Sequence, residues 1–128
     1  MHLIVNAADT PLTIKNEVLK YCYKYKTPFI TGGIGIKSGH WGPLLDNLSF
    51  ENGMVRIKKD KLLESFLRSQ TAVKGSSGFT NNIISSYLSY DVIMYLIGRN
   101  CHSYQKKCSV NFDTLEIKKI QSNEIIFF

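Results

Sequence analysis

The stretch Thr80-Asn-Asn-Ile-Ile-Ser-Ser-Tyr-Leu-Ser-Tyr-Asp-Val-Ile-Met-Tyr-Leu-Ile-Gly98, together with the residues that follow it, decides the fold class. Its apolar residues recur at helical spacing, and Gly98 is a natural helix stop. Beyond it, residues 108–112, 115–120 and 124–128 are rich in β-branched and aromatic residues and predict strands. Because the helix is apolar over a broad face, we expect it to be the central helix of the domain.

The residues toward the N-terminus predict a strand and then a long helix. Residues 2–5 form a short β-prone run. Thr10 followed by Pro11 is a typical helix start, and the helix should end near Lys26, just before the residue that precedes a proline. The expected buried stripe consists of Ile14, Val18, Tyr21, Cys22 and Tyr25.

The middle of the chain is less regular. Residues 29–43 contain five glycines and predict a loop, the kind of segment in which binding residues often lie. Asn52-Gly53 lies between two apolar runs and predicts a β-hairpin over residues 48–57. Asp60 is expected to cap a further helix over residues 60–67. The whole pattern predicts α+β: a single compact domain over residues 1–128, with about three helices on a mainly antiparallel sheet.

Composition excludes several classes of protein. With 128 residues and 44% hydrophobic content, the chain suits one globular domain, and its longest apolar run, residues 92–97, is too short to span a membrane. No secretory signal is visible, and three cysteines are an odd number, so we expect a cytoplasmic protein with free thiols. The net charge is +6, and most of the excess lies in residues 1–74. This charge favours an acidic partner or serves only solubility.

The motifs of known chemistry are mostly missing. Cys101, His102 and Cys108 lack the spacing of a zinc site, and Ile36 stands where a P-loop requires glycine, so we expect neither a metal nor a cofactor. His40 and His102 with Lys106 could cut RNA as acid and base if the fold brought them together. Lysines interleaved with tyrosines leave open a nucleic-acid partner.

The contact surface is expected around the glycine-rich residues. Tryptophan and tyrosine are favoured anchors of protein interfaces, although core packing would explain Trp41 equally well. The residues expected to bind a partner are Lys37, His40, Trp41, Arg56 and Lys58.

Residues Trp41 to Gly53 and Ser77 to Ile84 resemble small immunity proteins of bacterial contact-dependent inhibition systems. The resemblance implies a small cytoplasmic α+β protein that binds a cognate toxin domain and blocks its active or target-binding surface, with no catalytic residues. The high lysine content departs from the acidic character common among inhibitors of nucleases. The sequence thus predicts a non-enzymatic immunity protein, with a small basic RNA-binding protein or ribonuclease toxin as the alternative. It leaves the oligomeric state open.

Overall fold

The structure, a computed structural model, describes residues 2–8, 13–57, 62, 65, 78–121 and 125–127. Its larger sheet has five strands in the order β1-β2-β3-β5-β6, and every neighbouring pair is antiparallel except β1 with β2. A second, two-stranded parallel sheet pairs β4 with β7. The elements are β1 (Ile4–Asn6), α1 (Ile14–Tyr25), β2 (Phe29–Ile34), β3 (Ser38–Trp41), α2 (Asn47–Glu51), β4 (Val55–Ile57), α4 (Gly78–Leu96), β5 (Lys106–Asn111), β6 (Glu116–Gln121) and β7 (Ile125–Phe127).

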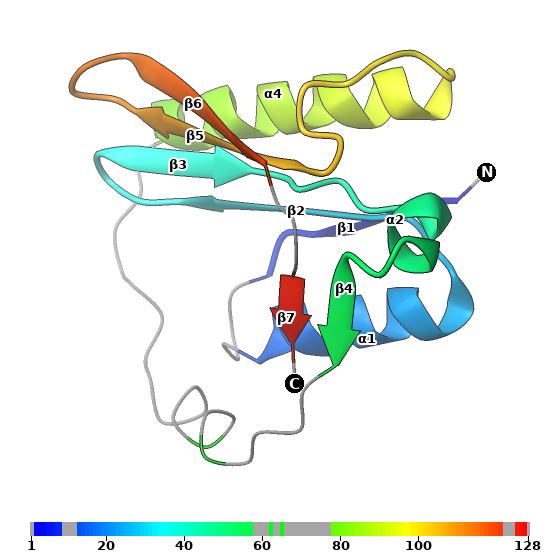
Figure 1. Ribbon diagram of the computed structural model, residues 1–128. Coiled ribbons are helices and arrows are strands. Elements are labelled where there is room, and N and C mark those ends of the chain that lie inside the picture. The colour runs from blue at the N-terminus through cyan, green and yellow to red at the C-terminus, as the bar shows by residue number, and fades with distance from the viewer. Residues whose placement is uncertain are drawn as a thin grey trace.

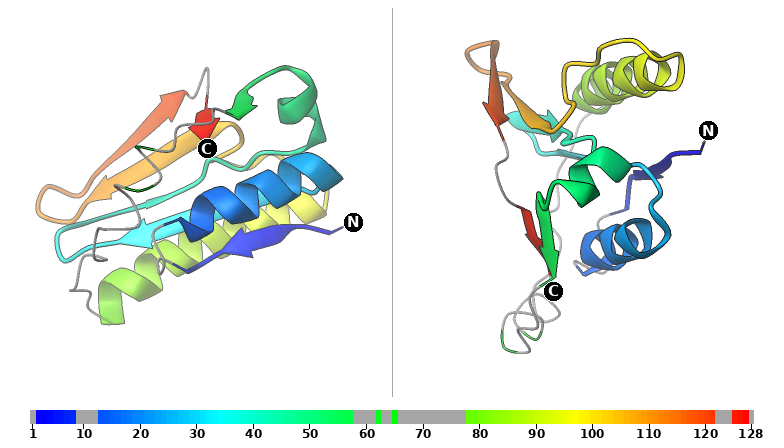
Figure 2. Two further views of the ribbon diagram at one scale, coloured as in Figure 1. Left: turned by 90° about the horizontal axis from the view of Figure 1, so that it is seen from below. Right: turned by 45° about the vertical axis from the view of Figure 1, so that its right-hand side comes forward.

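The described residues thus show the predicted α+β class, with three helices and a mostly antiparallel sheet (Figure 1). Helix α1 lies on one side of the larger sheet and α4 on the other, as both views of Figure 2 show. The helix predicted over residues 60–67 falls almost wholly outside the described residues. No helix in the described part of the chain is long and apolar enough to cross a membrane.

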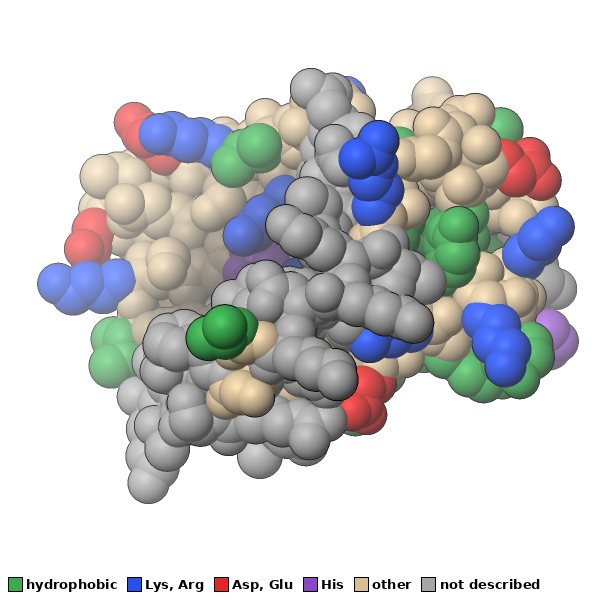
Figure 3. All heavy atoms as spheres, turned by 60° about the horizontal axis from the view of Figure 1, so that its bottom comes forward, with side chains coloured by type: hydrophobic (Ala, Val, Ile, Leu, Met, Phe, Trp, Pro, Cys, Tyr) green, Lys and Arg blue, Asp and Glu red, His purple; other side chains and the backbone are tan. Residues whose placement is uncertain are grey.

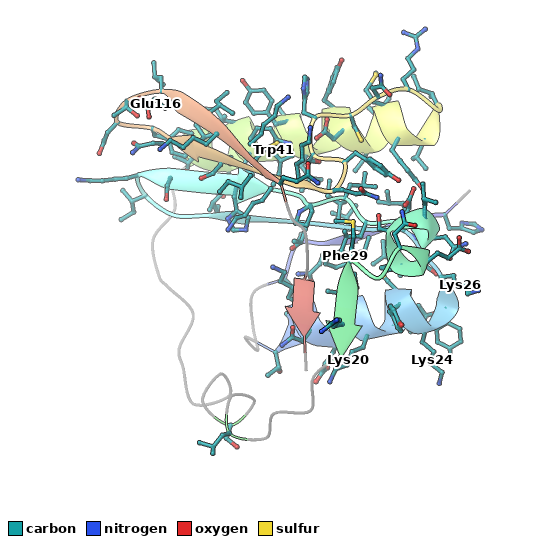
Figure 4. All side chains as sticks on the ribbon, in the orientation of Figure 1. Lys20, Lys24, Lys26, Phe29, Trp41 and Glu116 are labelled. Atoms are coloured by element: carbon teal, nitrogen blue, oxygen red, sulfur yellow. The ribbon has the colours of Figure 1, made fainter. Side chains whose placement is uncertain are left out.

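Two apolar clusters hold these layers together. On the α1 side, Phe29 packs with Leu19 and Cys22 of the helix and with the residues around α2 and β4. On the α4 side, Trp41 packs with Ile84 and two residues of β5. Figure 4 shows Trp41 and Phe29 toward opposite faces of the sheet. The two helices therefore cover opposite faces of the sheet around β2, next to the parallel pair, whereas β6 at the far edge is exposed at every residue.

The glycine-rich residues are not the predicted loop, because most of them lie in strands β2 and β3. The reason is the close approach of α4: a Cβ on Gly39 would lie 2.6 Å from Ile84 Cγ1, and one on Gly32 would lie 2.9 Å from Leu88 Cδ1. Gly42 has φ +82° and leads into the cis peptide bond before Pro43. Gly32 and Gly39 are therefore explained by the close packing of a helix on the strands and not by an irregular backbone.

The hairpin predicted over residues 48–57 is also wrong. Asp46 caps α2 through a reciprocal capping box with Ser49: the Asp46 carboxylate accepts from the Ser49 backbone amide at 3.1 Å. This cap favours a short helix, and the chain then turns at Gly53 into β4, which pairs with β7 instead of folding back on its neighbour. Strand β7 likewise belongs to a different sheet from β6.

Two further expectations are corrected on the helices. In α1 the buried residues are Leu19 and Cys22, whereas Tyr21 and Tyr25 are 52% and 57% exposed and pack on one another outside the core. Helix α4 is not buried on all sides: its inner residues face the sheet, while much of its outer side is exposed.

Candidate functional site

The residues expected to bind a partner do not form one surface. Trp41 is only 2% exposed, so its predicted role as an accessible anchor is wrong. His40 is half-buried, and it lies on the sheet face away from α4, because Gly39 and Trp41 on either side of it face that helix. Lys37 is exposed and lies 3.9 Å from Asp113, and Arg56 is exposed on β4. Lys58 lies outside the described residues.

Trp41 is buried because a fully buried carboxylate holds it. Its Nε1 donates to Asp91 Oδ2 at 2.9 Å, and the backbone amides of His102 and Ser103 donate to the two carboxylate oxygens, also at 2.9 Å. A buried carboxylate is tolerated when several donors satisfy it. This network joins α4 to β3 and to the segment before β5, so its role is to position these elements.

The histidines do not support the ribonuclease alternative. Burial, together with the positive charges of Lys107 and Lys15, lowers the pKa of His40 to about 4. His102 lies on the other side of the sheet, beside α4, where its ring stacks against Tyr90. The structure therefore does not bring the two histidines together, as general acid and base catalysis by the pair would need.

A second polar group surrounds Asp46. The hydroxyls of Tyr104 and Tyr95 donate to its carboxylate at 3.0 and 3.3 Å. Burial, and then the Asp46 charge, raise the pKa of Tyr95 to about 12, so its hydroxyl stays protonated. These residues border a hollow of about 650 Å³ that Arg99 and Lys106 also line. Because the Asp46 carboxylate already accepts from two hydroxyls and the α2 cap, the group is mainly structural.

Among the described residues, no group of three or more His, Cys, Asp or Glu side chains lies close enough together to hold a metal ion. Cys22, Cys101 and Cys108 are free thiols. Burial raises the pKa of the Cys22 thiol to about 11, which disfavours the reactive thiolate.

The best candidate for ligand binding lies at the carboxyl ends of the two parallel strands. Strand β1 ends at Asn6, which pairs with Thr31, so residues 32–34 of β2 extend beyond it. On that side they have no strand partner among the described residues. Beside them is a hollow of about 230 Å³, which we call the β1–β2 crevice. It is lined by Asn6, Ala7, Gly32, Gly33, Ile34, Asn81, Ile84, Ser85 and Leu88.

The rim of the β1–β2 crevice is held by side-chain hydrogen bonds. Asn6 is only 5% exposed, and its amide donates to Thr31 Oγ1 at 3.2 Å and to the Ala8 carbonyl at 3.3 Å. Thr31 Oγ1 in turn donates to the Asn6 carbonyl at 3.1 Å. In open sheets with parallel strands, ligands bind outside the carboxyl ends of those strands. The described residues of the crevice therefore offer fixed backbone and amide groups and no charged side chain.

The sequence reasoning missed this crevice. The strand-helix-strand order over residues 2–34 was the available signal, because a helix between two strands favours parallel pairing with both carboxyl ends at one edge. Because residues 29–43 were predicted to form a loop, strand β2, the partner of β1, was not predicted.

Comparisons with known proteins identify the fold only. No family model matches the chain, and no curated protein matches it. Among solved structures, Escherichia coli MccB with ATP is similar at TM-score 0.74 and 22% identity, covering 94% of this chain and 36% of MccB. The microcin C7 biosynthetic enzyme MccB with N-formylated MccA matches at TM-score 0.69 and 19% identity, over 92% of this chain and 37% of that one. PaaA matches at TM-score 0.65 and 14% identity, and the match covers 94% of this chain and 35% of PaaA.

These structures correct the expected function. The prediction of an immunity protein that neutralises a toxin is wrong, because the fold is shared with MccB, a biosynthetic enzyme that was solved with ATP and with MccA. The chain spans about a third of the length of MccB.

Proposed function

We propose that this chain forms part of a biosynthetic enzyme of the kind that MccB represents, one that uses ATP and acts on a polypeptide. The observation that carries the proposal is the match of 94% of the chain to MccB, whose structures include complexes with ATP and with MccA. In this proposal the chain supplies one wall of the substrate site, and the β1–β2 crevice is that wall.

The geometry of the crevice suits a polypeptide in extended conformation. Residues 32–34 of β2 present a strand edge that is open on the β1 side within the described part of the chain. An extended peptide can add to such an edge through main-chain hydrogen bonds. Gly32 and Gly33 carry no side chains that would hold the peptide backbone away.

The amides of Asn6 and Asn81 and the hydroxyl of Ser85 are the polar groups around this edge. The Asn81 amide can donate to and accept from a neutral backbone. Asn6 and Ser85 can accept through their side-chain oxygens, because their hydrogens already bind other groups of the protein. Among the described residues that line the crevice, none has a titratable side chain, so we assign binding rather than acid–base chemistry to them. The proposed role of this chain is to bind and orient the substrate.

Isothermal titration tests the proposal with two probes: AMPCPP with Mg²⁺, and N-formylated MccA. We expect at least one to bind with a Kd of about 1 mM or tighter, which corresponds to roughly 4 kcal/mol. Ser85→Leu fills the crevice from an exposed position of α4 and should weaken this binding at least tenfold. Ser89→Leu is the matched control, because Ser89 is exposed on the same helix and does not line the crevice.

Absence of binding by both probes at millimolar concentration would contradict the proposal. So would equal binding by the wild type and Ser85→Leu, because the ligand would then lie elsewhere.

A further inference from the structure

The outer side of α1 is a surface of tyrosine and lysine side chains, on the opposite side of the sheet from α4. Tyr21 and Tyr25 are 52% and 57% exposed, and their ring centroids lie 4.6 Å apart. Lys24 Nζ lies 5.3 Å from the centroid of the Tyr25 ring. Lys20 and Lys26 lie beside them, and we call these five residues the α1 face. Figure 4 shows the three lysines along the helix, and the left view of Figure 2 shows no described element over the outer side of α1.

Helical geometry places the side chains of the α1 face on one surface. Lys20 and Lys24 are four residues apart, as are Tyr21 and Tyr25, so each pair forms a column along the helix. The two columns are neighbours, because each tyrosine follows a lysine by one residue, a rotation of about 100°. Lys26 ends the helix in a left-handed conformation, with φ 54° and ψ 40°, and stays at the same end of α1 as Lys24.

The three lysines have no acidic partner among the described residues. The one salt bridge found between two described residues joins Lys37 and Asp113. Glu17 is the single acidic residue of α1, and it lies in the first turn, about 10 Å along the axis from Lys24. Figure 3 looks at the molecule from the α1 side and shows Lys and Arg side chains interspersed with hydrophobic ones, a class that includes tyrosine. The α1 face therefore attracts anions.

The dipole of α1 does not cancel this attraction. A helix carries a partial negative charge of about one half at its C-terminal end. There the Cys22 carbonyl accepts from the backbone amides of Lys26 and Thr27, and the Tyr25 carbonyl accepts from the Thr27 hydroxyl at 3.4 Å. Lys24 and Lys26 place two full positive charges at the same end, so the balance there is positive.

We propose that the α1 face binds a single-stranded nucleic acid, with its lysines on the phosphates and a base stacked on the tyrosine pair. Proteins that bind single strands with little sequence preference combine positive charge along the backbone with aromatic side chains on which the bases stack. The α1 face holds both kinds of group in adjacent columns. From Lys20 to Lys26 it covers about 9 Å of helix axis, the length of about three nucleotides at a rise of about 3.4 Å each.

Two other anionic partners would use this surface less fully. A helix that lies on a lipid surface inserts side chains such as Leu, Phe and Trp, whereas the exposed large apolar residues of α1 are all tyrosines. An acidic polypeptide would satisfy the lysines, but its carboxylates have no ring to stack on Tyr21 and Tyr25. A strand with unpaired bases supplies both phosphates for the lysines and ring faces for the tyrosines.

Fluorescence anisotropy with labelled oligouridine and oligothymidine of about 12 nucleotides tests the proposal. Both should bind, because the proposed contacts use phosphates and base faces, with a Kd of about 100 µM or tighter at about 0.15 M salt. Three lysine–phosphate contacts predict that log K falls with log salt concentration at a slope of about −2. Lys24→Gln should reduce the size of this slope by about 0.7. Lys118→Gln, which removes the same charge from exposed β6, should leave it unchanged.

A tyrosine variant tests the stacking contact separately. Tyr25→Leu keeps an apolar side chain on the helix but removes the ring, and it should weaken binding at least about fivefold with an unchanged circular dichroism spectrum. Tyr90→Leu is the matched control, because Tyr90 is 48% exposed on α4, and its affinity should equal that of the wild type.

Several results would overturn the proposal. They are no binding of either strand at millimolar concentration, equally tight binding of a duplex of the same length, or equal affinities of Tyr25→Leu and Tyr90→Leu. Displacement of the strand by polyglutamate or by phosphatidylserine vesicles at equal charge concentration would assign the α1 face to an acidic polypeptide or a lipid surface instead.

The proposal goes beyond the proposed function and is tested independently of it. Ser85→Leu, which fills the β1–β2 crevice, should leave the affinity for both strands unchanged. If Ser85→Leu weakens their binding, the strand lies in the crevice and the α1 face is not its site. Failure of AMPCPP and N-formylated MccA to bind would contradict the proposed function and leave the α1 face unaffected.

Discussion

Gly39 gives the sharpest test of how α4 packs on the sheet. An added Cβ would lie 2.6 Å from Ile84 Cγ1 and 2.7 Å from Ile84 Cδ1. Ile84 is only 3% exposed, and β-branched side chains in helices have one strongly preferred rotamer, so it cannot rotate away freely. Overpacking of this kind costs about 1–3 kcal/mol, and replacing glycine recovers about 0.5–1 kcal/mol from the unfolded state. We therefore expect Gly39→Ala to lower the free energy of unfolding by about 1–2 kcal/mol.

Urea unfolding followed by circular dichroism measures this loss, and calorimetry should show Tm lower by roughly 3–8 °C. Gly35→Ala is the matched control, since its Cβ would lie 3.6 Å from the nearest atom, which is ordinary contact. Its effect should stay within about 0.5 kcal/mol. In the double variant Gly39→Ala/Ile84→Ala, loss of both Cγ1 and Cδ1 should relieve the clash, giving a favourable coupling of at least about 0.5 kcal/mol.

Two results would refute this reasoning. If Gly39→Ala is as stable as Gly35→Ala, α4 does not approach β3 as closely as described. If the effects of Gly39→Ala and Ile84→Ala simply add, the two side chains do not meet.

The remaining predictions concern buried polar groups. Trp41→Phe should lower the free energy of unfolding by about 2–4 kcal/mol in urea titrations, because it removes a donor to buried Asp91 as well as ring contacts; an effect under about 0.5 kcal/mol would show that the bond contributes little. Burial lowers the pKa of His40 from its ordinary 6.5 to about 4 in the folded protein, so the free energy of unfolding should fall as pH drops from 6.5 toward 4. His40→Gln should flatten that fall; if the dependence of the unfolding free energy on pH is the same in the variant, His40 is not its cause. Iodoacetamide at pH 8 should label Cys22 at least about tenfold more slowly in the native protein than in urea, and equal rates would contradict its burial.

The parts of the fold that depend on local pattern were predictable. The helix ending at Lys26, the helix before Gly98 and the strands β5 and β6 lie close to where spacing and turn residues placed them. Local signals in these segments agree with the tertiary structure.

The failures arise where distant contacts decide. Glycine occurs at position 39 of strand β3 because α4, about forty residues away in the sequence, packs too closely for a side chain there. Trp41 is buried where its indole N–H donates a hydrogen bond to Asp91 of the same helix. The chain does turn at Asn52-Gly53, as predicted, but the residues before this turn form helix α2 instead of a strand, because Asp46 caps that helix. The crevice at Asn6 depends on parallel pairing of two segments, which no local pattern of residues specifies.

A two-dimensional NMR map of amide shifts on titration with N-formylated MccA, and separately with AMPCPP and Mg²⁺, tests the proposed substrate site most directly. The account predicts that the largest shifts fall on Asn6, Gly32, Gly33, Ile34 and Ser85. Shifts centred instead on the hollow beside Asp46 and Arg99, or no shifts with either probe, would contradict it.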